Sequence, residues 1–529
     1  MKISYIIVTV LSVFATAGCQ KFLDHTQYGQ PTSENFWKTE EDAISARNAL
    51  TNWTAREGID GRGHMWFENC SDNLVTGRPQ AQGDQIKAFK MTASTERDWI
   101  QNWPRMYQII ASANDIFRNV PEMEISADVK NNVIAEAHFW RGFSYLWLAP
   151  WYGDNSVNGG IPIITELTPV EELDKERPAS VIENYDMIID DMAKAGDLLP
   201  LYSQISDADK GRPHKAAAWG FAARAALYAA QYDAKYYDVV LDMTQRIMNL
   251  GGADARSLYP DFTTLFSEAN NFSSEYIFSM LGNANDGPKF AGMSFQNGGY
   301  GLYNTWGYFQ PTLELYKAYE SGDIRRDATI LYPGSSIQFI GRNIFFGVSP
   351  REISSTSGMT FRKWMHPFRE ANAAGTSVNA NGNNASTRMG LPILRYADIV
   401  LMRAEALIWS RGEGNAEAVS LLNQIRKRAG LPENSAATKD QLKNERRCEL
   451  AFEFLPSRFV DLVRWKDFDK LQQPLHGVSP QYDTAGNIIG INEVEIFPAR
   501  VFNPQVNHVF PIPERFRTQG KNLKQNVGY

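Results

Sequence analysis

Residues 403–430, RAEALIWSRGEGNAEAVSLLNQIRKRAG, match an earlier stretch of the chain in length and layout. Residues 224–251 read RAALYAAQYDAKYYDVVLDMTQRIMNLG, and the two stretches align without a gap. Identical residues stand at Arg224/Arg403, Ala225/Ala404, Val240/Val419, Gln245/Gln424 and Gly251/Gly430. Two helices joined by a short turn, with alanines where the helices approach, predict a tetratricopeptide-like repeat. The alternative is that these are two unrelated helical hairpins.

Helical patterning extends over much of the rest of the chain. Residues 39–55, 97–119 and 127–148 place apolar side chains three and four positions apart, as one face of a helix requires. Pro104 should start or kink the second of these helices. Ser180 and Glu183 form a capping-box pattern before a further helix. The fold class predicted is mainly α, with tetratricopeptide-like helical repeats.

Three stretches lack this patterning. Residues 282–310 and 333–390 are rich in Gly, Asn and Ser with aromatic residues between them, which predicts loops. The end of the chain, from about 471 to 529, contains several prolines and is also expected to be irregular.

Composition excludes some classes of function. The chain has 529 residues and a formal net charge of −7, and therefore lacks the clustered basic face that nucleic-acid binding needs. Its three cysteines, Cys19, Cys70 and Cys448, make neither a disulfide framework nor a metal signature. We predict no cofactor, no metal and no nucleic-acid partner.

The N-terminus has the layout of a signal peptide. One lysine precedes an apolar run from Ile3 to Phe14, and small residues follow it. The stretch Ala17-Gly18-Cys19 resembles the lipobox of bacterial lipoproteins, in which the cysteine is acylated, although Thr16 stands where leucine is usual. We therefore predict that Cys19 is the lipidation site. Ordinary cleavage nearby, with an unmodified or disulfide-bonded Cys19, is the alternative.

Several longer stretches resemble the SusD/RagB family of Bacteroidetes outer-membrane lipoproteins. They are SENFWKTEEDAISARNAL (33–50), AEAHFWRGFSYLWLAPWYGDN (135–155), LPILRYADIVLMRAEAL (391–407), ERRCELAFEFLPSRFVDLVRW (445–465) and a terminal segment within 511–529. Two departures affect local loops: FLPS replaces the glycine usual after the Phe-Glu pair, and Val527 stands where proline is common.

The resemblance implies a helical fold with a loop-rich, ligand-binding insertion. It also implies a non-enzymatic function: capture of a glycan at the cell surface, beside a TonB-dependent (SusC-like) transporter barrel, by a protein held in the outer membrane through its lipid. The expected organisation is a signal peptide (1–18), a lipid-anchored tether (19–35), an N-terminal helical region (36–251), a loop-rich ligand-binding region (252–390) and a C-terminal region with the signature helices (391–529).

Two segments have the residues that a sugar site needs. Sugars offer C–H faces that stack on aromatic rings, and hydroxyls that Arg, Asp, Asn and Gln can grip. Residues 65–85 and 298–310 combine these types, and the predicted ligand contacts are Trp66, Asp72, Asn73, Arg78, Tyr303 and Trp306. The resemblance singles out Trp306, because an aromatic residue near this point contacts glycan in the family. A core position is the alternative for Trp66, and half-buried packing for Trp306.

Other charged and aromatic clusters have structural explanations. Arg362, Trp364 and His366 fit a structural strand, and the alternating charges of residues 445–464 fit a packing surface laced with salt bridges. No hydrolase, zinc-protease, Walker or dinucleotide motif occurs. Three alternatives to glycan capture remain: capture of peptides by the same architecture, a tetratricopeptide scaffold, and a glycosidase, which needs only two carboxylates at the right separation.

Overall fold

The computed structural model describes ten stretches of the chain. They are residues 36–51, 62–77, 81–95, 102–156, 158–281, 309–339, 342–345, 356–363, 389–453 and 457–529. The predicted signal peptide, Cys19 and the tether therefore lie outside the described residues.

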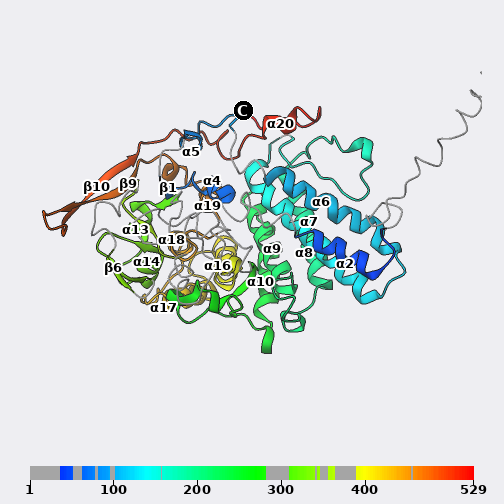
Figure 1. Cartoon of the computed structure of the whole chain (residues 1–529), viewed down its shortest axis with the longest axis horizontal. Coiled ribbons are helices and arrows are strands. Elements are labelled where there is room, and N and C mark those ends of the chain that lie inside the picture. Colours follow the sequence, from blue (N-terminus) through cyan, green and yellow to red (C-terminus); the bar gives the residue numbers. More distant parts are fainter. Residues whose placement is uncertain are drawn as a thin grey trace, which may run out of the picture.

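Antiparallel helices form the N-terminal half of the protein (Figure 1). Consecutive helices from α6 to α10 pack on each other, and α2 packs on α6 and α7. Their bounds are α2 (Glu40–Ala49), α6 (Asn102–Asn119), α7 (Ala127–Tyr152), α8 (Val181–Leu198), α9 (Lys215–Ala229) and α10 (Tyr236–Met248). Pro104 lies in the first turn of α6, where its missing N–H needs no partner, so it starts the helix and does not kink it.

The two aligned stretches are both helical hairpins. In the gap-free alignment Tyr236 stands opposite Asn415, and the second helices, α10 and α17 (Ala416–Arg428), begin within one residue of each other. The hairpin α9–α10 lies beside the hairpin α16–α17, since α16 (Tyr396–Arg411) packs on both α9 and α10. The prediction of a mainly α fold with paired helices is confirmed.

Helix α7 forms the centre of the helical half because its second half, from Phe139 to Tyr152, is largely apolar and buried on nearly every side. Its aromatic residues Phe139, Trp140, Phe143, Trp147 and Trp151 are all at most 3% exposed. A helix that is hydrophobic all round is buried between neighbours, and here α6 and α8 flank it. Within the described chain, no helix has the length and apolarity that crossing a membrane requires.

The C-terminal half mixes short helices with two-stranded antiparallel sheets. The sheets pair β1 (Leu74–Thr76) with β3 (Phe309–Pro311), β2 (Tyr276–Met280) with β8 (Leu391–Arg395), β4 (Ile330–Leu331) with β7 (Thr360–Phe361), β5 (Ser336–Phe339) with β6 (Arg342–Phe345), and β9 (Leu475–Tyr482) with β10 (Ile488–Phe497). The remaining α-helices are α4 (Arg62–Glu68), α5 (Ala81–Lys87), α11 (Phe262–Leu265), α13 (Leu313–Ala318), α14 (Ile324–Thr329), α18 (Lys439–Glu449), α19 (Arg458–Trp465) and α20 (Glu514–Arg517).

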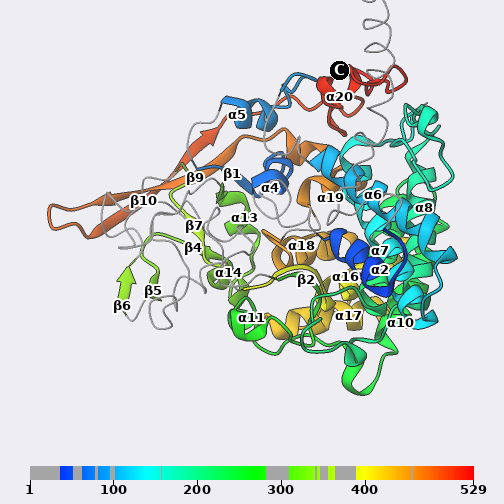
Figure 2. The ribbon, with the colours of Figure 1, turned by 45° about the vertical axis from the view of Figure 1, so that its right-hand side comes forward.

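The expectation of an irregular chain end is wrong for residues 475–497. Strands β9 and β10 form a long hairpin, which extends from the body on the side opposite α6–α8 (Figures 1 and 2). Its turn is stabilised by Asp483, whose carboxylate accepts hydrogen bonds from the backbone N–H groups of Ala485 and Asn487 at 2.9 and 2.8 Å. The hairpin forms although Pro480 lies within β9 and Pro474 and Pro498 flank the two strands.

The charged signature helix α18 is buried and structural, as the sequence predicts. Glu445 and Glu449 form ion pairs with Arg325, Arg395 and Arg428. Burial alone would raise the pKa of the Glu449 carboxyl, but the charges of these arginines hold that pKa well below its usual range. A buried carboxylate held ionised by arginines on α14, β8 and α17 ties α18 to three other elements.

Arg224 and Arg403, which align in the two helical hairpins, both form contacts between the hairpins. Arg224 forms an ion pair of 2.5 Å with Asp398 at the start of α16. Arg403 donates to the Leu241 carbonyl of α10 at 2.9 Å. Both side chains therefore connect the first helical hairpin to the second.

Candidate functional site

The two segments predicted to hold ligand contacts meet in one small sheet. Strand β1 belongs to the first segment and β3 to the end of the second, and Thr76 stands opposite Phe309 in their antiparallel register. Arg78 follows Thr76 by two residues, while Trp306 and Tyr303 precede Phe309 by three and six. Arg78, Tyr303 and Trp306 lie outside the described residues, and their ligand roles stay predictions.

The structure places Asp72, a predicted ligand contact, as a buried anchor of this sheet. It is 5% exposed and pairs with Arg447 of α18 and Arg458 of α19, each at 3.0 Å. Burial alone would raise the pKa of the Asp72 carboxyl, but the charges of the two arginines outweigh it and hold the pKa well below its usual range. Both carboxylate oxygens thus face arginines in the core, not a ligand.

Asn73 has the same structural role. It is 2% exposed, and its side-chain oxygen accepts a hydrogen bond of 2.8 Å from Arg447. Its carbonyl accepts from the backbone N–H of Thr312 at 3.0 Å, while the Thr312 hydroxyl donates to the Asp72 carbonyl at 2.7 Å. Asn73, a predicted ligand contact, thus fastens β1 to the segment that follows β3.

Trp66 lies in the core, which was the alternative to its prediction as a ligand contact. It is 0% exposed and lies in helix α4, with its ring edge-to-face on Phe309 at 5.1 Å between centroids. A Cβ at Gly83 would lie 2.4 Å from the indole, so α5 packs directly on it. Trp66 offers no face to a sugar, and it supports β3 and α5 from beneath.

A buried carboxyl lies next to the β1–β3 sheet and the three residues that support it, Asp72, Asn73 and Trp66, which together we call the β1–β3 base. Glu68 accepts hydrogen bonds from the hydroxyls of Ser457 at 2.6 Å and Ser71 at 3.0 Å. Burial outweighs these bonds and raises the pKa of Glu68 to about 7. Burial also raises the pKa of the Cys70 thiol to about 12, so this cysteine is not a thiolate nucleophile at neutral pH.

A cavity of about 820 Å³ opens beside α5, directly after position 80. Exposed or half-buried polar side chains on its wall include Asp84, Gln85 and Lys90 from the α5 side and Asn503 from the chain after β10. Carboxylate and amide groups of this kind can grip hydroxyls. Asp84 and Gln85 lie within the predicted segment 65–85, but the sequence did not distinguish them, because their exposure depends on the distant chain after β10.

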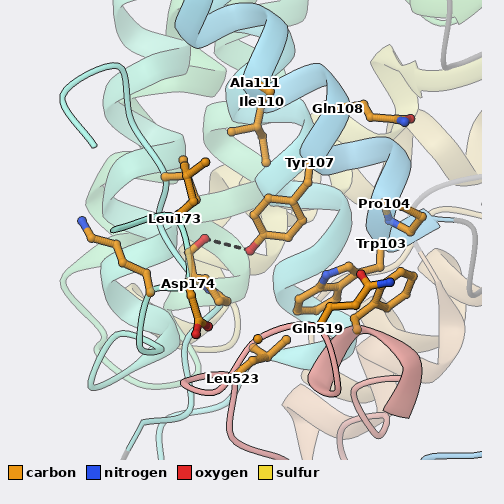
Figure 3. A pocket seen from close by; sticks show the side chains of 15 residues that line it. Trp103, Pro104, Tyr107, Gln108, Ile110, Ala111, Leu173, Asp174, Gln519 and Leu523 are labelled. Atoms are coloured by element: carbon orange, nitrogen blue, oxygen red, sulfur yellow. Dashed lines mark hydrogen bonds between the residues drawn. The ribbon is translucent and has the colours of Figure 1, made fainter. Parts of the chain in front are cut away.

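A second hollow, of about 560 Å³, lies between α6 and the C-terminal segment (Figure 3). Trp103 and Tyr107 of α6 face Leu173 of the α7–α8 connection and Leu523 near the chain end. The Tyr107 hydroxyl donates to the Pro162 carbonyl at 2.8 Å. No sequence pattern pointed to this hollow, since its walls come from three distant segments.

The described ranges hold no cluster of three or more His, Cys, Asp or Glu side chains that could bind a metal ion.

Sequence profiles of known families match most of the chain. The profile described as "SusD family" matches residues 272–529, and one described as "Starch-binding associating with outer membrane" matches residues 21–227. The chain belongs to the SusD family. The resemblance predicted from the sequence is confirmed.

Relatives match this SusD-family protein over nearly its whole length. SusD-like protein P2 of Formosa agariphila is 26% identical over 561 residues, which cover 99% of each chain. A SusD-like protein of Bacteroides fragilis has the same fold, with a TM-score of 0.77, 24% identity, and coverage of 94% of this chain and 99% of its own. A laminarin-binding SusD-like protein follows at a TM-score of 0.72 and 23% identity, covering 93% and 100%.

The two departures from the SusD pattern fall at different kinds of position. Of the FLPS turn, residues 454–456 lie outside the described chain, while Ser457 is buried against Glu68. Val527, which replaces the common proline, is 64% exposed. A residue that contacts mainly solvent tolerates this exchange without a loss of core packing.

Proposed function

We propose that this SusD-family protein binds a polysaccharide or oligosaccharide at the outer membrane, without hydrolysing it, and delivers it to a TonB-dependent transporter. The observation that carries the proposal is the β1–β3 pair, which joins the two predicted ligand segments at one place. Its support is rigid, because Asp72, Asn73 and Trp66 tie it to α18, α19 and α4. A preorganised base lowers the entropy that ligand binding costs.

The proposed site consists of the chain around Arg78, Tyr303 and Trp306 together with the cavity beside α5. Covalent geometry limits each residue to about 3.6 Å of chain, so Arg78 and Trp306 stay within reach of the Thr76–Phe309 pair. The aromatic residues would stack on sugar rings, and Asp84, Gln85 and Asn503 would bind hydroxyls. Solved structures with this fold include a laminarin-binding SusD-like protein and a structure with a xylogluco-oligosaccharide, which supports a glycan as the ligand.

The carboxylates near the β1–β3 base support binding without catalysis, because most of them are already engaged by protein side chains. A glycosidase needs two carboxyl groups about 5–10 Å apart across a sugar. Asp72 is held by two arginines and Glu68 is enclosed by two serines. Among the described residues that line the cavity beside α5, Asp84 is the one acidic side chain.

The first experiment is a glycan array run beside a peptide panel. The full chain without its signal peptide should bind one glycan class, including laminarin or xyloglucan oligosaccharides among the probes, and should release no reducing ends from it. Selective binding of peptides would favour the alternative ligand class. Hydrolysis of the bound glycan would show that the protein is an enzyme.

A further inference from the structure

The connection between α7 and α8 exposes apolar side chains while being held firmly in place. Its first part is extended along α6: Tyr107, Asn114 and Arg118 donate to the carbonyls of residues 162, 164 and 166 at 2.8, 3.0 and 2.8 Å. Three donors on one helix face thus bind every second carbonyl. This part of the connection is fixed to the body before the exposed side chains begin.

The far end of the connection is fixed as well. The Asp174 carboxylate accepts from the backbone N–H groups of Lys521 and Asn522 at 2.7 and 3.2 Å, and Arg177 donates to the carbonyls of residues 159, 160 and 524. Residues 167–173 between these anchors form turns, including the 3₁₀ helix Val170–Glu172. The turns therefore display their side chains in a set arrangement.

Three of these side chains are large, apolar and exposed. Leu167, Val170 and Leu173 are 84%, 79% and 49% exposed, and we call them the apolar ridge. Leu173 also lines the hollow of about 560 Å³ whose opposite wall is Trp103, Tyr107 and Leu523 (Figure 3), which we call the α6 hollow. Exposed apolar groups that adjoin an apolar hollow are typical of a binding surface.

Three exposed glutamates and one exposed lysine flank the apolar ridge. Glu171, Glu172 and Glu176 form no ion pair with a basic side chain of the described chain, and we call them the acidic rim. Lys175 stands between them and also lines the α6 hollow, so the glutamates outnumber the bases of this segment. A partner must therefore offer positive charge around its apolar contact.

The α6 hollow suits an apolar side chain better than a sugar. Trp103 is 5% exposed, the Tyr107 hydroxyl is bonded to Pro162, and the Asp174 carboxylate already accepts two N–H groups. Gln108, Lys175 and Gln519 are the polar side chains that remain in the lining, and the rest of the wall is mainly apolar. The acidic rim also disfavours an anionic lipid surface.

We propose that the apolar ridge and the α6 hollow dock a protein segment that presents an apolar side chain between basic residues. The apolar side chain enters the hollow between Trp103, Tyr107 and Leu173, as anchor residues do in protein interfaces. The basic neighbours pair with Glu171, Glu172 and Glu176. This inference is independent of the proposed glycan site, which is built on other elements.

A photocrosslinker tests this docking surface in cells. p-Benzoylphenylalanine in place of Val170, which is 79% exposed on the apolar ridge and lies outside the lining of the α6 hollow, should crosslink one protein through a segment with an aliphatic or aromatic residue flanked by Lys or Arg. Leu173→Ser with Glu171→Lys should lower the yield at least tenfold. Leu198→Ser with Glu122→Lys is the matched control, because these residues are also exposed but lie elsewhere. An unchanged yield in the first variant, no discrete product, or a crosslinked segment without this chemistry would overturn the proposal.

Peptides test the chemistry on the purified full chain. Lys-Lys-Trp-Lys-Lys should bind at least tenfold more tightly than Lys-Lys-Gly-Lys-Lys or Glu-Glu-Trp-Glu-Glu, as measured by fluorescence anisotropy at low salt. Ala111→Trp should fill the hollow and abolish this preference without changing the melting temperature or glycan affinity. Equal binding of the tryptophan and glycine peptides, no binding, or an effect of bound glycan on the peptide would contradict a separate docking surface.

Discussion

At the proposed glycan site, some residues are predicted to contact the sugar and others support the β1–β3 base. A substitution of Trp306 tests a predicted contact. Trp306→Ala removes one predicted stacking face, and the loss of an aromatic–ring contact costs about 1–3 kcal/mol by analogy with bases stacked on aromatic rings. Glycan affinity should fall roughly tenfold to a hundredfold in calorimetry. The melting temperature should hardly move, as is usual for surface substitutions.

The matched control for that substitution is Trp66→Ala, which removes a tryptophan from the support. Trp66 is 0% exposed, so its loss should lower the free energy of unfolding by roughly 3–5 kcal/mol. Affinity should suffer only as far as folding does. A stable Trp306→Ala protein that binds glycan like the wild type would exclude Trp306 from the site.

Glu68 predicts a pH dependence of stability. Burial raises its pKa in the folded protein to about 7, while an unfolded Glu titrates near pH 4.3. Between these values the unfolded chain has lost this proton and the folded protein keeps it, so stability falls as pH rises. The loss due to Glu68 reaches about 4 kcal/mol above pH 7.

Glu68→Gln should remove this component, because the amide does not ionise. Urea unfolding of both proteins at pH 5 and pH 8 measures it: the stability of the variant relative to the wild type should increase with pH. The opposite trend would show that Glu68 is ionised in the folded protein and stabilised by the hydroxyls of Ser71 and Ser457.

At the scale of elements, one threonine couples the α13 cap to the β1–β3 base. The Thr312 hydroxyl donates to the Asp72 carbonyl at 2.7 Å and accepts from the Leu315 N–H at 3.3 Å, the N-cap bond of α13. Thr312→Val keeps the shape and removes both bonds, so stability should fall by about 1–2 kcal/mol. Glycan affinity should weaken too, because β3 leads directly into the site.

The N-cap of α2 supplies the control for this coupling. Thr39 accepts from the Asp42 N–H at 3.2 Å, far from β1. Thr39→Val should cost stability of the same order and leave glycan affinity unchanged. Equal affinities of both variants, measured where both are fully folded, would mean that the β1–β3 base does not position the ligand loops.

The elements also show how far the sequence alone predicts this fold. Helical hairpins were predictable because their apolar spacing and caps are local. The β9–β10 hairpin was not, since β9 contains Pro480 and β10 has no buried residue along its length, so no core contact marks either strand clearly. The β1–β3 pair joins residues 76 and 309, which no local pattern connects.

The same limit explains the outcome at the site. Asp72 and Asn73 have the composition of a sugar site, but their burial depends on Arg447 and Arg458, nearly 400 residues away. Residue type therefore selected two segments that the structure joins in one sheet, while three of the predicted contacts, Asp72, Asn73 and Trp66, are buried. Arg78, Tyr303 and Trp306, outside the described chain, remain predicted contacts.

At the scale of the whole molecule, the proposed glycan site, the proposed docking surface and the predicted lipid anchor involve different parts of the chain. The proposed glycan site lies over the β1–β3 base and α5, the proposed docking surface lies between α6 and the C-terminal segment, and the predicted anchor is at Cys19. The glycan and docking surfaces share no described residue. Substitutions at one should leave the other unchanged, unless they unfold the protein.

The anchor can be tested apart from both surfaces. We predict that Cys19→Ala moves the protein from the membrane fraction to the periplasm, because a chain held by several acyl groups stays bound whereas an unacylated chain does not. Its glycan affinity should match the wild type. Thr16→Leu, which restores the usual residue of the pattern, should retain full membrane association. Unchanged fractionation of Cys19→Ala, together with no labelled fatty acid on the wild-type protein, would show that the attachment does not depend on this cysteine.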